Sequence, residues 1–300
     1  MIIDSHVHLV TAGMIDKMLK RYDGVGKGIA SKAFAQGNHG FISNSFIKFL
    51  KGMSIRKHAD LWATELDKNK IDRALFLPIS ENNDELFEFI KLHPNRFTGY
   101  VYLDKPASKQ GVKTLKKWIE TGAFRGLKLY PTIQGVSAAD ERLFPLYEMA
   151  GRLSIPILFH FGITMAPIYD YRYTNPIDLS LPSRLFPDTN FIIAHFGAGY
   201  FREALMLGYR SHNIHLDTSG TNNWREYLPD VMPLNKIFKR ALEVYGPKKI
   251  LFGTDSILND KAGYRSHILK EQKKALSSLK VTKKDRDLLM GGTAVRLFGL

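Results

Sequence analysis

Ile155-Pro156-Ile157-Leu158-Phe159-His160 is a short apolar run that ends in a polar residue, and this design recurs along the chain. β-Branched and aromatic residues favour a buried strand, while the turn residues and helically spaced apolar residues that follow favour a helix. We expect eight such strands, at residues 1–8, 72–79, 97–103, 125–130, 155–160, 190–195, 213–218 and 249–254.

Eight strands that alternate with helices predict a parallel sheet, because parallel neighbours need crossover connections. Eight is also the number that closes a (β/α)8 barrel, whose usual length of about 250 residues fits within this chain of 300. An open doubly wound sheet is the alternative. No Pro/Ser-rich linker or internal repeat divides the chain, so residues 1–300 are expected to form a single α/β domain.

The segment 9–66, between the first and second strands, is roughly twice as long as a barrel connection requires. It contains Gly24-Val25-Gly26-Lys27-Gly28 and Gly37-Asn38-His39-Gly40. A dinucleotide-binding glycine motif directly follows a strand and opens a helix, and this segment does neither. We therefore expect a flexible, lid-like insertion over the barrel mouth rather than a phosphate site.

Composition excludes several classes of protein. Hydrophobic residues make up 44% and charged residues 24%, which is typical of globular chains and not of disordered ones. The absence of cysteine excludes disulfides, zinc fingers, iron–sulfur clusters and thiol nucleophiles. There is no apolar run long enough to span a membrane and no signal-peptide pattern at the N-terminus, so a cytoplasmic protein without membrane association is expected.

The net charge of +14 raises the question of nucleic-acid binding. The basic residues are spread along the chain as single residues and Lys-Lys pairs, at 116–117, 248–249, 273–274 and 283–284. No basic tail or RNA-binding motif accompanies them. We therefore expect no nucleic-acid partner, and instead a basic surface that attracts small anionic molecules. A homodimer is compatible with the sequence.

Polar residues stand at the ends of several expected strands. Because side chains alternate along a strand, His6, His8 and Asp4 share one face of the first strand. His160 and His195 close the fifth and sixth strands, and Asp255 follows the eighth. The C-terminal strand ends of a barrel meet at one rim, where catalytic residues lie in this fold.

Imidazole and carboxylate groups in this number favour zinc, manganese or iron, and a site that keeps one position open is catalytic. A single histidine at a strand end is more often a hydrogen-bonded structural residue. That interpretation is applied to the histidines that lack the strand-end pattern, namely His39, His58, His93, His212, His215 and His267.

The chain resembles the amidohydrolase superfamily over essentially its full length, specifically the amidohydrolase-related branch that includes aminocarboxymuconate-semialdehyde decarboxylase and predicted metal-dependent hydrolases. The resemblance rests on Asp4-Ser5-His6-Val7-His8, on the segments that end in His160 and His195, and on three further motifs. These are Arg125-Gly126-Leu127-Lys128-Leu129-Tyr130-Pro131, Leu251-Phe252-Gly253-Thr254-Asp255-Ser256, and the closing segment 291–300. That segment has Thr293 where the family usually has Asn.

The resemblance implies a distorted (β/α)8 TIM barrel. It further implies that His6, His8, His160 and Asp255 hold one divalent metal ion, with zinc expected first and manganese or iron as alternatives. Asp255 would also take a proton from water. His195 would lie beside the metal as a catalytic acid–base or polarising group.

Three roles are compatible with Lys128. In binuclear members of the superfamily a lysine on the fourth strand is carboxylated and bridges two metals, so a second ion is expected only if Lys128 is modified in this way. It could instead bind a substrate carboxylate, which we favour, or pair with an inward-facing acid. Strand alternation places Lys128 and Tyr130 on one face and Leu127 and Leu129 on the other.

Arg172 lies among Tyr169, Tyr171 and Tyr173 just beyond the fifth strand. An arginine among aromatic rings can bind a carboxylate of a planar substrate, so Arg172 is a second candidate for substrate binding. Alternatively, the loop only packs beneath the lid.

The resemblance favours an enzyme that uses metal-activated water on a small, anionic cyclic amide, ester or lactone. The alternative is a metal-dependent non-oxidative decarboxylase or hydratase of an aromatic-derived carboxylate. A barrel without catalysis that binds an anion or nucleic acid would have no reason to keep all five strand-end groups.

Overall fold

The computed structural model describes residues 1–26, 43–164, 166, 169–258 and 263–300. All eight expected strands are present, and the eighth region contributes two short pieces. The strands are β1 (Ile3–Leu9), β2 (Arg73–Pro78), β3 (Phe97–Tyr102), β4 (Phe124–Leu129), β5 (Ile157–Phe159), β6 (Phe191–Ile193), β7 (Ile214–Asp217), β8 (Ile250–Leu251) and β9 (Ser256–Ile257).

The strands form one sheet in the order β8-β7-β6-β5-β4-β3-β2-β1-β9, and every pairing is parallel. The two ends of this order belong to one stretch of chain, because β8 pairs with β7 and β9 pairs with β1. Between them, the Ser5 N–H donates to the Phe252 carbonyl at 2.9 Å. The sheet therefore curls into a distorted TIM barrel, as expected.

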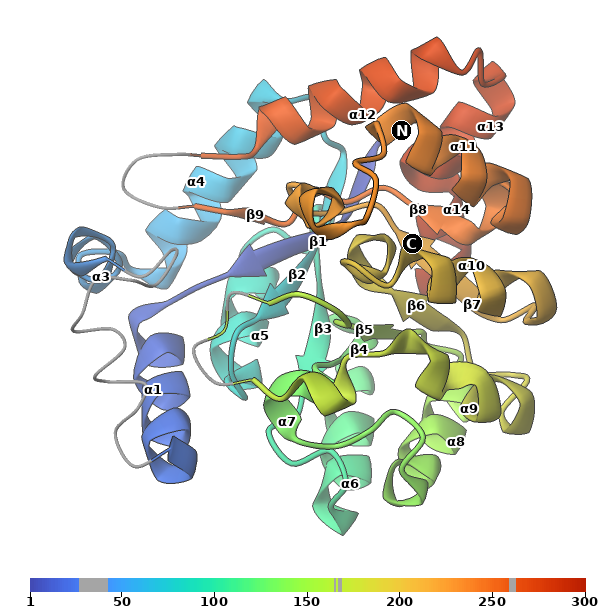
Figure 1. The fold of residues 1–300 in the computed structure, drawn as a ribbon. Coiled ribbons are helices and arrows are strands. Elements are labelled where there is room, and N and C mark those ends of the chain that lie inside the picture. The colour runs from blue at the N-terminus through green and yellow to red at the C-terminus, as the bar shows by residue number, and fades with distance from the viewer. Residues whose placement is uncertain (27–42, 165, 167–168, 259–262) are drawn as a thin grey trace.

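Helices surround the sheet (Figure 1). They are α1 (Ala12–Gly26), α3 (Asn44–Lys51), α4 (Ile55–Lys68), α5 (Asn83–Leu92), α6 (Lys109–Ile119), α7 (Pro131–Gln134), α8 (Phe144–Arg152), α9 (Ser180–Leu185), α10 (Phe201–Arg210), α11 (Leu234–Tyr245), α12 (Ser266–Ser278), α13 (Lys283–Asp287) and α14 (Thr293–Phe298). Local sequence explains several starting points. Ser54 and Ser108 cap α4 and α6 by accepting backbone N–H groups with their side chains.

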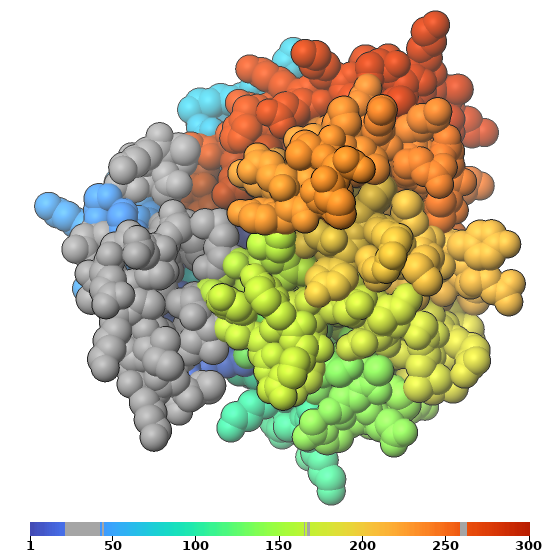
Figure 2. Space-filling view, in the orientation of Figure 1, coloured from blue at the N-terminus to red at the C-terminus, as the bar shows by residue number. Residues whose placement is uncertain are grey.

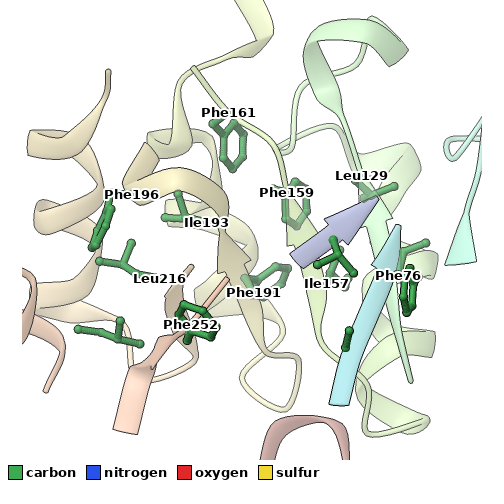
Figure 3. Close-up of a cluster of buried hydrophobic side chains, with 14 of the residues drawn as sticks. Phe76, Leu129, Ile157, Phe159, Phe161, Phe191, Ile193, Phe196, Leu216 and Phe252 are labelled. Carbon is green, nitrogen blue, oxygen red and sulfur yellow. The ribbon is translucent and has the colours of Figure 1, made fainter. Parts of the chain in front are cut away.

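Strand residues that face outward pack against these helices and form the main core. Figure 3 shows part of this layer, in which Ile157, Phe159, Phe191 and Ile193 lie close together. These positions alternate with inward-facing ones along each strand. The alternation fixes which side chains enter the barrel, and so it decides which residues can build a site there.

A second apolar cluster fills the inside of the barrel. It combines inward residues of the strands with the final helix α14, and its fully or nearly buried members are Ile3, Leu75, Leu77, Tyr100, Leu158, Ile192, Ala194, Leu251, Ala294, Leu297 and Phe298. The Phe298 ring meets the Tyr100 ring edge-on at 5.5 Å. The final helix therefore plugs the end of the barrel at which the strands begin.

The insertion differs in part from the expectation. Its last helix, α4, buries Ala59, Trp62 and Leu66 in the main core, so α4 is an ordinary barrel helix. Helix α1 is anchored to the barrel, because the Arg21 guanidinium donates to Asp104 Oδ1 at 2.5 Å and the Ser80 hydroxyl donates to the Met14 carbonyl at 2.9 Å.

The flexible lid that we expected has no support in the described part of the insertion. The segment 37–40 and part of 24–28 lie outside the described residues. Among the helices of the described residues, none combines the length and the apolar character that crossing a membrane requires.

Candidate active site

The five strand-end residues come together at the mouth of the barrel. His6 and His8 point inward from β1, His160 directly follows β5, and His195 is the second residue after β6. Asp255 lies between β8 and β9, and its backbone N–H donates to the His6 carbonyl at 2.8 Å. The register of the barrel thus sets these residues side by side, although they are up to 249 positions apart in sequence.

Short distances connect all five side chains. His8 Nε2 lies 3.0 Å and His6 Nε2 3.6 Å from Asp255 Oδ1. His195 Nε2 lies 3.2 Å from His160 Nδ1. His6, His195 and Asp255 offer three ligand atoms that all lie within 4.8 Å of one another. The convergence predicted from the sequence is therefore present, and His195 belongs to the same close group as His6 and Asp255.

The backbone is strained at two of these residues. His195 has φ 56° and Asp255 has φ 58°, in the left-handed region that most side chains avoid. His195 also begins a run of five residues, 195–199, that all have positive φ. Such conformations cost on the order of 1–3 kcal/mol each and persist where surrounding contacts enforce them, commonly at functional sites.

Sequence reasoning missed Asp217, which ends β7 and is completely buried. Its Oδ2 lies 2.5 Å from His6 Nδ1. Burial tends to raise the pKa of Asp217, but His6 and His195 more than offset it and keep the carboxyl ionised. An ionised carboxylate only accepts hydrogen bonds, so His6 carries its hydrogen on Nδ1. The strand-end pattern that singled out the histidines applies equally to Asp217.

Ser219 is the second residue that the sequence did not reveal. It is fully buried, and its Oγ lies 2.8 Å from His195 Nδ1, 3.0 Å from His6 Nδ1 and 2.9 Å from Asp217 Oδ2. Gly253 makes this packing feasible, because a Cβ there would stand 2.9 Å from atoms of Asp217, His6 and Ser219. The glycine of the eighth-strand motif therefore allows the close approach of three site residues.

Asp4 connects the segments on both sides of the site. Its carboxylate accepts hydrogen bonds from the Thr254 and Tyr264 hydroxyls at 2.5 and 2.7 Å, and from the His6 and Thr254 backbone N–H groups. Burial raises the pKa of Asp4 to about 7, against the effect of these bonds. Next to Tyr264, Arg265 Nη1 donates to Asp255 Oδ2 at 3.3 Å.

Burial also controls the charge of the histidines. It lowers the pKa of His6, lowers that of His160 well below its usual value, and lowers that of His195 to about 4. For Asp255, burial works to raise the pKa, but the hydrogen bond from His8 and the nearby basic groups, Arg265 among them, hold it well below normal. At neutral pH His6, His160 and His195 are therefore neutral beside an ionised carboxylate, the forms in which these groups bind metals.

Lys128 points into the barrel, as strand alternation predicts, and it is 2% exposed. Among the described residues its Nζ has no hydrogen-bond partner, and it lies 5.5 Å from the centre of the Tyr130 ring. Burial lowers the pKa of Lys128 to about 8, although Asp217 and Asp255 counteract this. The Tyr130 ring in turn stacks on His160 with 4.0 Å between ring centres.

Arg172 is not brought into the cluster. Its side chain is 79% exposed and pairs with Asp170 in its own loop, with 2.6 Å between Nη2 and Oδ2. The neighbouring Tyr169 and Tyr171 rings lie 4.6 Å apart. Burial raises the pKa of Tyr171, with smaller contributions from the nearby Tyr169, Tyr200 and Tyr227, the last of these in the segment after β7. Figure 2 shows the segments that follow β5 and β7 side by side on this face.

The histidines that were interpreted as structural include two that are buried away from the cluster. His58 faces the Phe89 ring within the outer core, and burial lowers its pKa to about 4. His215 Nε2 lies 3.0 Å from Asn190 Oδ1. His93 is partly exposed beside Asp60, and His39 lies outside the described residues.

Comparisons with known proteins agree with the fold. A family model described as Amidohydrolase matches residues 3–300. The 5-carboxyvanillate decarboxylase of Sphingomonas paucimobilis has a similar structure, with a TM-score of 0.70, 14% identity, and coverage of 100% of this chain and 99% of that one. No curated protein matches the chain in sequence.

Two further structures contain metals. A zinc-bound amidohydrolase of Burkholderia multivorans has a TM-score of 0.67 and 15% identity, and the match covers 100% of this chain and 99% of that one. The 5-carboxyvanillate decarboxylase of Novosphingobium aromaticivorans, complexed with manganese and 4-hydroxy-3-methoxy-5-nitrobenzoic acid, has a TM-score of 0.68 and 15% identity, with 100% and 96% covered. At these identities the likeness establishes a shared fold.

Proposed function

This chain belongs to the amidohydrolase family, and from that premise we propose that it is a metal-dependent hydrolase of a small, anionic cyclic amide, ester or lactone. A second candidate is a metal-dependent non-oxidative decarboxylase or hydratase of an aromatic-derived carboxylate. It is supported by the similarity in fold to two enzymes described as 5-carboxyvanillate decarboxylases.

One observation carries the proposal. His6 Nε2 is a buried nitrogen without a hydrogen-bond partner among the described residues, and its ring is held by Asp217 at Nδ1. With the hydrogen on Nδ1, Nε2 presents a lone pair toward Asp255 Oδ1. A histidine that donates one ring N–H to a carboxylate and leaves the other nitrogen free is the usual form of a metal ligand. Leaving this nitrogen buried and unpaired would otherwise be costly.

The pair formed by His160 and His195 supports the same conclusion. His160 Nε2 faces the Ile163 carbonyl at 3.1 Å, and His195 Nδ1 faces the Ser219 carbonyl at 3.2 Å. A carbonyl only accepts, so both outer nitrogens carry the hydrogen. In neutral rings the two inner nitrogens then face each other at 3.2 Å as lone pairs. A bound cation or an additional proton relieves this contact.

The residues present therefore fit a divalent ion. We propose His6, His8, His160 and Asp255 as its ligands and zinc as the ion, with manganese or iron as alternatives for this nitrogen and oxygen donor set. When bound, such an ion acts as a Lewis acid and lowers the pKa of water to about 7. A second ion would require carboxylation of Lys128.

The protein's own groups would perform the proton transfers. Asp255 is ionised and keeps one oxygen toward the histidines while Arg265 holds the other, so it can accept a proton from water. We assign His195 the acid–base role, because its Nδ1 is linked through Ser219 to Asp217 and its Nε2 faces the site. A buried carboxylate behind a histidine stabilises the charged ring that forms when the histidine takes a proton.

We propose that Lys128 binds the anionic group of the substrate. Its ammonium group is buried and without a hydrogen-bond partner among the described residues, so a carboxylate would satisfy it. This role is compatible with both candidate reactions, since both act on an anionic molecule.

The two reactions are distinguished by their products. Zinc-loaded and manganese-loaded protein would be incubated with anionic lactones, cyclic amides and esters and with hydroxylated aromatic carboxylates, and products would be identified by mass spectrometry. Hydrolysis adds one water and breaks an ester or amide bond, hydration adds one water to a double bond, and decarboxylation releases carbon dioxide. The product's mass therefore identifies decarboxylation, and its NMR spectrum separates hydrolysis from hydration. The Asp255→Asn variant is the control for contaminating enzymes. If no metal form turns over either class, the proposal is wrong.

A further inference from the structure

The turn after β7 places Ser219 in contact with both His6 and His195. The Ser219 N–H donates to Asp217 Oδ1 at 2.6 Å, which closes a tight turn over residues 217–219. This turn brings the Ser219 hydroxyl back onto the other oxygen of the same carboxylate, at 2.9 Å. Asp217 itself contacts His6, but among the described residues no direct hydrogen bond joins it to His195.

The direction of each hydrogen bond follows from the atoms involved. The Asp217 carboxylate only accepts, so the Ser219 hydroxyl donates to it. The Ser219 carbonyl also only accepts, at 3.2 Å from His195 Nδ1, so that nitrogen carries a hydrogen. The same N–H lies 2.8 Å from Ser219 Oγ, whose lone pairs remain available after the hydroxyl has donated. The chain of hydrogen bonds therefore runs from His195 to Ser219 and on to Asp217.

We propose that Ser219 is a positioning residue that connects Asp217 to His195, so that one buried carboxylate fixes the tautomer of both His6 and His195. Asp217 acts on His6 directly and on His195 only through the serine. Both rings then carry hydrogen on Nδ1 and present a bare Nε2 to the site, where His6 binds the metal and His195 accepts a proton. The role given to His195 rests on the proposed function, but the tautomers do not require a metal.

The packing around His195 favours this arrangement. Gly220 follows the serine with φ 91°, and a Cβ there would stand 3.1 Å from His195 Nδ1. His195 is 7% exposed. Because water has little access to Nδ1, the Ser219 hydroxyl and carbonyl are its hydrogen-bond partners among the described residues.

The test is to read the tautomers by long-range ¹H–¹⁵N NMR of the histidine rings, in which protonated and bare ring nitrogens resonate in separate ranges. Spectra would be recorded at neutral pH on the purified protein, with and without zinc, and assigned with His6→Gln and His195→Gln variants. We expect both rings to carry hydrogen on Nδ1. Observation of His195 with hydrogen on Nε2 alone would overturn the proposal.

Two variants separate the direct contact of Asp217 with His6 from its indirect contact with His195 through Ser219. Ser219→Ala removes the hydroxyl but keeps the Ser219 carbonyl as an acceptor for His195 Nδ1, so it should partly release the His195 tautomer, seen as ring ¹⁵N shifts averaged between the two forms, and leave His6 unchanged, whereas Asp217→Asn should alter both rings. Ser80→Ala is the matched control, since Ser80 is also buried and its hydroxyl makes one hydrogen bond to a carbonyl. An unchanged His195 in Ser219→Ala would overturn the role of the hydroxyl.

Zinc affinity, measured by competition with a chelator, gives an independent result. Asp217→Asn should weaken zinc binding about 10- to 100-fold, the usual effect of removing a group that orients a metal ligand. Ser219→Ala should bind zinc as the wild type does, and an equal loss in both variants would overturn the division of roles. Wild-type protein that binds no zinc would contradict the proposed function, and the tautomers of the zinc-free protein would still decide this inference.

Discussion

The two ends of the barrel are lined by the same strands and differ in chemistry. Where the strands begin, Leu75, Leu158 and Leu251 face inward and α14 covers them with Leu297 and Phe298. Where the strands end, the inner wall instead carries histidines, aspartates and a lysine. Apolar burial stabilises the first end by roughly 25 cal/mol per Å². The second end buries polar nitrogens that lack hydrogen-bond partners in the described part of the chain, which costs stability.

Strained backbone conformations are also concentrated at the mouth of the barrel. Of the eight non-glycine residues with positive φ in the described chain, five follow strands β6, β7 and β8 at the mouth, namely His195, Phe196, Ala198, Asn222 and Asp255. The plugged end thus contributes stability, and the mouth carries strain and unpaired buried groups of the kind that gather at functional sites.

The largest effect should come from a substitution at the mouth of the barrel, and it should be an effect on turnover. His195→Gln keeps a hydrogen-bonding side chain but cannot shuttle protons, so turnover should fall about 100- to 10,000-fold. Metal content and the free energy of unfolding should change little, which elemental analysis and urea titration would check. A variant that lost its metal would identify His195 as a ligand, and one with full activity would identify it as structural.

The plugged end should respond in the opposite way. Phe298→Ala removes a ring that is 3% exposed and packed on Tyr100. The free energy of unfolding should drop by about 3–5 kcal/mol, while metal content stays at the wild-type value. Loss of metal from a variant that is still folded would show that the two ends are coupled.

We expect acid to destabilise the protein because buried neutral histidines must take up a proton. His58, which lies outside the mouth of the barrel, tests this cause. His58 has its pKa lowered to about 4 by burial, whereas an unfolded chain has a histidine pKa near 6.5. Between these values the unfolded chain binds more protons, so stability is complete above about pH 6.5 and falls by up to about 3 kcal/mol as the pH drops toward 4. His58→Leu should reduce this loss in urea unfolding at several pH values. An equal loss in both proteins would contradict the assignment.

Substitution of Lys128 should give the smallest effect, and it tests how the mouth of the barrel binds the substrate. Lys128→Met should keep the metal and raise KM about tenfold, equivalent to about 1.4 kcal/mol, because a substrate anion loses its charged partner. Metal stoichiometry and KM would be measured together. A drop in stoichiometry from two to one or none would instead show that a carboxylated lysine bridges two ions.

Much of this arrangement could be predicted because the strand periodicity is strong. The apolar runs locate all eight strands, and the polar residues at their ends identify His6, His160 and Asp255 from the sequence alone. Asp217 could have been found by the same pattern, since it ends β7, but a pattern centred on histidines does not select it.

Other features depend on tertiary contacts that a sequence does not display. Ser219 reaches the site only because Asp217 closes a turn around it. His195 has a left-handed backbone, which no residue preference predicts at this position. The position of Arg172 was predicted from its aromatic neighbours, yet its own Asp170 holds it at the surface.

The most direct test of the central claim is the metal content of the purified protein. After incubation with zinc or manganese and removal of free ions, elemental analysis should find about one equivalent per chain, and His160→Ala should lose most of it because one of four ligands is gone. Wild-type protein that holds no metal after this treatment would contradict the account and indicate that the mouth of the barrel works without an ion.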